Sequence, residues 1–150
     1  LTMMLSCTAI FLMTYQGYDK SDRRINFVSG LLALGVVFFP CNTVWLDPEK
    51  PIGLFQLSPS TSQIVHNISA GLLFLSFSLN ILMQFTKGNG VTRTLVFKIC
   101  GRGMVVCLVF FLLSEVLGFL PGYFTMIFES ILLLLFGVAW LVKGKTFDID

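Results

Sequence analysis

The chain has 150 residues, of which 55% are hydrophobic and only 12% are charged, and its formal net charge is +2. A soluble domain carries about 25% charged residues, so a soluble monomer of this composition would expose large apolar patches and aggregate. The composition therefore excludes a typical soluble enzyme, a disordered segment and a nucleic-acid binder with a basic face. It leaves a protein that crosses a membrane several times.

Five apolar segments follow one another along the chain, at residues 1–15, 25–39, 64–85, 95–119 and 124–142. Their apolar residues are continuous rather than alternating with polar ones, which indicates helices and not the strands of a membrane barrel. A helix also satisfies its own backbone hydrogen bonds in lipid. The predicted fold class is therefore all-α, a polytopic transmembrane helix bundle that forms one domain over residues 1–150.

The first apolar segment is short for a membrane span. As a helix, its 15 residues would cover roughly 22 Å, less than the ~30 Å of the hydrocarbon core. The sequence also begins at Leu1 rather than at Met. We therefore expect this segment to be truncated and the sequence to begin part-way through a longer protein.

Chemical motifs are sparse. The four cysteines, Cys7, Cys41, Cys100 and Cys107, form no C-x-x-C pair, which argues against a disulfide framework or a structural zinc site. The chain also lacks a P-loop, a G-x-G-x-x-G phrase and a G-x-S-x-G elbow. We expect no cofactor, no metal and no catalytic residue of a known type.

The basic residues fall on one side of the predicted membrane. Alternating spans place residues 16–24, 86–102 and the C-terminal tail on one face, here called the basic face, and the 40–63 loop and the 120–123 turn on the other. The basic face then holds nine of the ten basic residues, and the other face holds only Lys50. The positive-inside rule predicts that the basic face and the C-terminus are cytoplasmic and that the 40–63 loop is extracytoplasmic. An aromatic belt at the outer interface fits Trp45 and Tyr123.

Three ionisable residues lie inside apolar segments away from the basic face: His66, Glu115 and Glu129. Such groups are costly in lipid and are functional candidates by default. All three are expected at similar depth in the outer leaflet, where they would form an intramembrane polar cluster. The residues that would support the cluster are Asn67, Ser69, Ser114 and Ser130.

Three interpretations of this cluster stay open. It can serve as a proton relay, a cation site or a general acid–base pair. The structural alternative is that the glutamates are protonated or reach the interface, while His66 forms a hydrogen bond between helices. A contact with a partner protein is the third. One histidine and two glutamates make a poor catalytic zinc site, because such sites normally have three well-placed ligands.

Small residues within the segments predict close helix packing, because they let backbones approach in lipid. They occur in the second and third segments and at Gly101-Arg102-Gly103. Those in the second and third segments are Ser29, Gly30, Ala33, Gly35, Ser69, Ala70 and Gly71.

Several phrases resemble an uncharacterised group of bacterial multi-pass membrane proteins. They are YQGYDKSDRRINFVSGLLALGVVFFP, IVHNISAGLLFLSFSLNIL, FKICGRGMVV and FESILLLLFGVAWLVKGKT. The resemblance covers nearly the whole chain and implies a bundle of about six helices, with one helix upstream of Leu1. It implies no known activity.

The leading hypothesis is an integral membrane protein without catalytic activity, an accessory or sensing component with an outer-leaflet polar pocket. The alternatives are a small proton- or cation-coupled transporter that uses Glu115, Glu129 and His66, and an intramembrane enzyme that modifies lipids. The expected partners are the lipid bilayer and a membrane-protein partner or a second copy of the chain, and nucleic acid is not expected. The expected location is the inner cell membrane.

Overall fold

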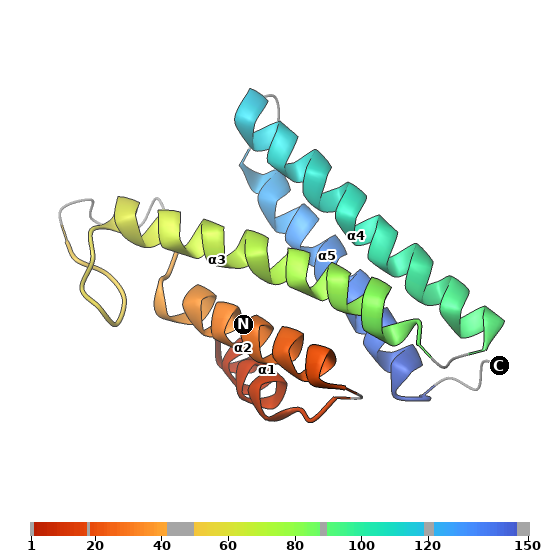
Figure 1. The fold of residues 1–150 in the computed structure, drawn as a ribbon. Coiled ribbons are helices and arrows are strands. Elements are labelled where there is room, and N and C mark those ends of the chain that lie inside the picture. The colour runs from red at the N-terminus through yellow and green to blue at the C-terminus, as the bar shows by residue number, and fades with distance from the viewer. Residues whose placement is uncertain (1, 18, 42–49, 88–89, 119–121, 147–150) are drawn as a thin grey trace. The chain divides into compact units, whose positions relative to one another are not determined.

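The computed structural model describes residues 2–17, 19–41, 50–87, 90–118 and 122–146, and these are helical for most of their length (Figure 1). The helices are α1 (Thr2–Thr14), α2 (Lys20–Phe38), α3 (Pro59–Asn80), a short π-helix η1 (Ile81–Phe85), α4 (Val91–Leu117) and α5 (Tyr123–Lys143). No strand occurs in these ranges, and an isolated bridge joins Ile52 to Leu57. The prediction of an all-α fold is confirmed for this part of the chain.

Helices α2 and α3 each begin five residues before their apolar segments. Helix α2 begins at Lys20 because the carboxylate of Asp19 caps it, accepting a 2.8 Å hydrogen bond from the backbone N–H of Asp22. Helix α3 begins at Pro59, a residue suited to the first helical position because its missing N–H is not needed there. A capping carboxylate at α2 and a proline at the first position of α3, rather than hydropathy, therefore set these boundaries.

Two helices also end at residues with clear physical causes. Pro40 cannot continue α2, and the last backbone N–H of that helix region, at Phe39, donates to Gly35 O. Helix α4 ends at Leu117 because Gly118 adopts a left-handed conformation, φ +64°, and donates its N–H to Ser114 O. Both ends are ordinary C-terminal caps.

The described chain divides into two compact units, residues 1–73 and 74–150. In the first unit, α1 packs closely on α2 through small residues. A Cβ atom added to Gly30 would lie 2.7 Å from the carbonyl oxygen of Ala9, and one added to Gly35 would lie 2.7 Å from the Ser69 hydroxyl. Ala33 is fully buried. The predicted packing role is confirmed at these positions, whereas Gly71 has no neighbour within 4 Å.

In the second unit, α4 and α5 run side by side in opposite directions (Figure 1). Contacts between aromatic rings fix how these helices align with each other and with η1. The ring centre of Phe85 lies 5.6 Å from that of Phe97 and 5.1 Å from that of Trp140. At the other end, the ring centres of Phe128 and Phe111 are 5.5 Å apart. The predicted close packing at Gly101 is also confirmed, since an added Cβ would lie 2.6 Å from Leu82. The turn at 119–121 and Trp45 lie outside the described residues.

Three helical stretches are long and apolar enough to cross a membrane: Pro59–Phe85, Val91–Leu117 and Tyr123–Lys143. Helix α1 is apolar but shorter. Many large apolar side chains of α4 and α5 are exposed, among them Val106, Val116, Met126 and Leu134. Lipid is the solvent that suits such surfaces, and the membrane character expected from the composition is consistent with them.

Candidate functional site

His66 caps the C-terminal end of α2. Its Nδ1 lies 2.8 Å from the carbonyl oxygen of Phe39 and 3.2 Å from that of Val36. Because both neighbours are acceptors, Nδ1 carries the proton and donates it. One turn earlier on α3, Ser62 donates a 2.8 Å hydrogen bond to Pro40 O. Carbonyls at the end of α2, which the helix itself leaves without donors, thus receive hydrogen bonds from α3.

The two glutamates lie in the second unit and differ in exposure. Glu115 is exposed on α4, in its last turn, and Glu129 is half-buried on α5. The contact of Phe128 with Phe111 places Glu129 near the level of Phe111, with Glu115 about one helical turn further along α4, ~6 Å.

The serines next to the glutamates bond to their own helices. Ser114 donates to Phe111 O at 2.7 Å, and Ser130 donates to Met126 O at 2.7 Å. Such bonds satisfy hydroxyls in a helix without involving a neighbour. In the first unit, Asn67 is exposed, while Ser69 is half-buried and lies against Gly35. His66 lies in the first unit and the glutamates in the second, so their predicted meeting stays a prediction.

A buried polar pair lies at the start of α2, in a stretch where hydropathy alone predicts a loop. Asp22 and Asn26 are both fully buried. The Asn26 amide donates to Asp22 Oδ1 at 2.7 Å and to Asp22 O at 2.8 Å. The sequence does carry a signal for this pair: Asp22, Asn26, Ser29 and Ala33 follow helical spacing, so they form one polar and small face that continues from the charged loop into the apolar segment.

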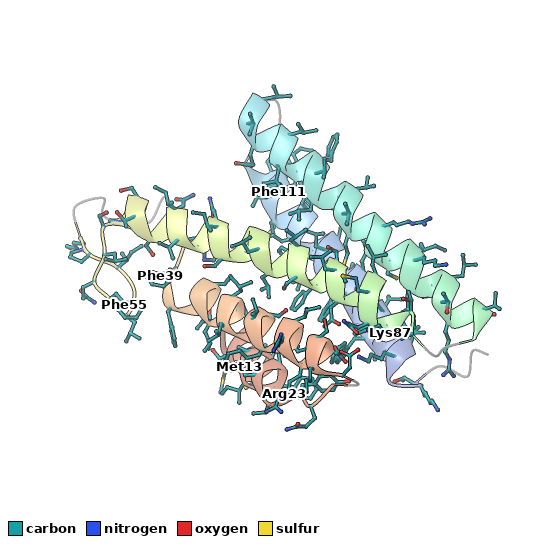
Figure 2. The ribbon with its side chains drawn as sticks, viewed as in Figure 1. Met13, Arg23, Phe39, Phe55, Lys87 and Phe111 are labelled. Atoms are coloured by element: carbon teal, nitrogen blue, oxygen red, sulfur yellow. The ribbon has the colours of Figure 1, made fainter. Side chains whose placement is uncertain are left out.

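A second cluster that the apolar pattern does not reveal surrounds the π-helix. Lys143 Nζ lies 3.8 Å from the ring centre of Phe85 and 5.2 Å from that of Trp140, distances suited to cation–π attraction. Gln84 is buried and accepts a 2.7 Å hydrogen bond from Lys87 Nζ. Figure 2 shows Lys87 just beyond the end of α3 and η1. This cluster joins one end of α5 to η1, and Lys87 and Lys143 both belong to the predicted basic face.

An aromatic contact joins the described residues that precede α3 to the end of α2. Phe55 stacks on Phe39 with ring centres 5.1 Å apart, and Figure 2 shows the two residues side by side. Gly53 allows this turn, because its φ of +74° is unfavourable for other residues. Leu54 and Phe55 remain exposed at the tip.

Within the described ranges, no group of three His, Cys, Asp or Glu side chains is placed to hold a metal ion. Comparison of the chain with protein-family models, with curated proteins and with solved structures finds no match. The chemistry of the side chains is therefore the basis for a function.

Proposed function

We propose that the protein is a multi-pass integral protein of the inner cell membrane, with an accessory or sensing role and no catalytic activity. The observation that carries the proposal is the exposure of α4 and α5. Only 28% of the most apolar 18-residue window of α4 and 17% of that of α5 is buried. Leaving so much apolar surface in water costs about 25 cal/mol per Å², and a bilayer removes that cost.

The proposed topology has six spans in the full bundle, with the C-terminus in the cytoplasm and the 40–63 loop outside. The alignment of α4 and α5 supports this topology. It places three basic residues at one end of the second unit, the end where the Phe85 ring makes its contacts: Lys87, Arg93 and Lys143. Helix α2 has 19 residues, or roughly 28 Å, and its first-turn basic side chains can extend to the interface. A span by α2 is therefore consistent with its length.

The roles of the polar side chains favour a non-catalytic function. A general base needs a nitrogen or oxygen free to take a proton from a substrate. Ser114 and Ser130 donate within their own helices, and His66 donates its Nδ1 proton to Phe39 O, so that Nε2 is the ring nitrogen able to take a proton. These hydrogen bonds give the three side chains a structural role, and the proposed outer-leaflet polar pocket responds to a ligand rather than transforming it.

Membrane fractionation and reporter fusions test the location and topology. The protein should stay in the membrane pellet after extraction with alkaline carbonate. Green fluorescent protein fused after Asp150 should fluoresce, and alkaline phosphatase fused there should be inactive, because that enzyme matures outside the cytoplasm. Release by carbonate, or an active phosphatase at Asp150, would contradict the proposal.

A second candidate function, proton- or cation-coupled transport, is favoured by one observation: Glu129 is half-buried within an apolar helix. Carboxylates in such positions mark ion pathways in many transporters. The purified protein in liposomes with an internal pH-sensitive dye separates the two functions.

The accessory role predicts proton entry no faster than in protein-free liposomes. Transport predicts faster entry that Glu129→Gln abolishes. The matched control is Glu129→Asp, which keeps a carboxylate at the half-buried position and should retain flux, while Glu115→Gln shows whether the second carboxylate shares the pathway.

A further inference from the structure

One face of α4 is exposed along nearly its whole length. Successive exposed residues on that face follow helical spacing of three or four. They are Leu95, Ile99, Arg102, Val106, Val109 and Leu113, and the exposed Lys98 lies beside Ile99. The face is therefore an apolar stripe that is interrupted by two positive charges, both near the beginning of the helix.

The depth of these charges is unusual for a membrane helix. If Leu117 marks the outer edge of the hydrocarbon core, a thickness of ~30 Å places the inner edge about 20 residues earlier, near Lys98. Arg102 then lies ~6 Å inside that edge. A long side chain reaches the headgroup level from this depth, where the anionic groups available to it are lipid phosphates.

No acidic side chain of α4 competes for these charges, because the helix carries no Asp or Glu before Glu115. Lys98 and Arg102 are four residues apart, so their side chains lie on one side of the helix, one turn from each other. The Arg guanidinium pairs with two phosphate oxygens at once, and Lys supplies a compact second charge. Together they place two positive charges within one helical turn, which is enough to neutralise the single negative charge of a phosphodiester headgroup.

We propose that Lys98 and Arg102 form a binding site for an anionic phospholipid on the cytoplasmic leaflet side of α4. The headgroup phosphate lies between the two basic side chains, and the acyl chains follow the apolar stripe from Ile99 toward Val109. This inference rests on the proposed membrane location. The stripe selects a lipid over a free phosphate ion, because apolar contact area supplies binding that an inorganic ion cannot use.

Binding of a phosphatidylglycerol with a fluorescent acyl chain to the purified full chain in neutral detergent tests the site. Phosphatidylcholine with the same label, whose headgroup has no net charge, is the comparison lipid. The unaltered protein should bind phosphatidylglycerol about tenfold more tightly than phosphatidylcholine. The double variant Lys98→Gln/Arg102→Gln should bind both lipids with the affinity that the unaltered protein shows for phosphatidylcholine.

The chain offers a matched control. Lys20 and Arg24 are also exposed basic residues four positions apart, on α2. The double variant Lys20→Gln/Arg24→Gln removes the same charge, and its affinity for phosphatidylglycerol should stay within about twofold of the unaltered protein. Equal losses in both double variants would mean that net charge alone attracts the lipid, and would overturn the site.

Two further results keep the proposal separate from the proposed function. A protein that stays in the carbonate-washed membrane but shows no preference for phosphatidylglycerol overturns the lipid site and leaves the membrane role intact. This measurement needs no variant, so it decides the question even where a variant fails to fold. Displacement of the lipid by excess inorganic phosphate at constant ionic strength would indicate a phosphate-ion site instead and would also overturn the proposal.

Discussion

Gly30 and Gly71 are both glycines inside helices, yet the space around them differs. A Cβ at Gly30 would lie 2.7 Å from a backbone oxygen of α1, which cannot move without shifting that helix. Overpacking of this kind costs about 1–3 kcal/mol. At Gly71 no atom lies within 4 Å, and replacing a helical glycine by alanine gains about 0.5–1 kcal/mol.

We therefore predict opposite shifts for the two alanine variants. Gly30→Ala should lower the thermal unfolding midpoint of the protein in detergent, and Gly71→Ala should raise it slightly. Circular dichroism at the helical band measures both. A Gly30→Ala protein as stable as the unaltered one would show that α1 and α2 do not pack as closely as the structure has them.

The hydrogen bond of His66 predicts a specific order of substitutions. Asparagine places its amide nitrogen near the position of Nδ1, whereas glutamine places it near Nε2. His66→Asn should therefore keep the bond to Phe39 O and most of the stability. His66→Gln and His66→Ala should lose about 1 kcal/mol, because a half-buried acceptor is left without its donor. The same stability for all three variants in chemical unfolding would contradict the capping role.

At the scale of the elements, the π-helix η1 sets the direction in which the Phe85 ring points. A π-helix is most often a one-residue widening of an α-helix. Deleting the exposed Met83 would restore the α-helical register and rotate Gln84 and Phe85 by about 100° about the helix axis. Phe85 would then leave its contacts with Phe97, Trp140 and Lys143.

We predict that the Met83 deletion destabilises the second unit by about 3–5 kcal/mol, the usual cost of removing a buried aromatic ring. The fluorescence of Trp140 during unfolding, with Trp45 replaced by Phe, reports on this unit directly. Met83→Ala is the control, since it keeps the register and removes only an exposed side chain. Its unfolding midpoint should match that of the unaltered protein.

The elements also show how far the sequence can be interpreted without a structure. Apolar runs reveal helices well, because hydrophobicity that continues over about twenty residues is typical of a membrane-spanning helix. The first turns of α2 and α3 are harder to predict, since the caps at Asp19 and Pro59 extend each helix beyond its apolar part. The π-helix left no sequence signal, because its register depends on the packing of Phe85 against other helices.

For the candidate polar residues too, the sequence predicts some features and not others. Sequence position identifies His66 as a polar group in an apolar segment, but its acceptors belong to a helix end 27 residues earlier in the chain. Only tertiary packing reveals that pairing. Asp22 looks like a charged loop residue, because Lys20 and Arg23 lie close to it in the sequence. Its spacing to Asn26, however, indicates that the two residues share one helical face. Whether His66, Glu115 and Glu129 meet in the assembled bundle stays a prediction.

For the whole molecule, the proposed topology predicts which cysteines a membrane-impermeant maleimide reaches. Cys41 is exposed just after the end of α2, and the proposal places it outside. A variant that keeps Cys41 alone should be labelled in intact cells. A cysteine-free variant carrying Lys145→Cys should be labelled only after the cells are permeabilised. The reverse pattern would invert the topology, and labelling of both in intact cells would contradict it.

The shallow burial of α5 has a consequence for how its sequence can change. Only 17% of the apolar 18-residue window of α5 is buried. Most side chains of this helix are therefore constrained by the apolar lipid around them and not by the shape of a neighbouring side chain. In a saturation mutagenesis experiment, exposed positions such as Met126, Leu134 and Val138 should accept almost any apolar residue and reject charged ones. Only the inward positions, Phe128, Leu132 and Ala139, should discriminate by size. We therefore expect related chains to diverge strongly in sequence along α5 while they keep the same fold.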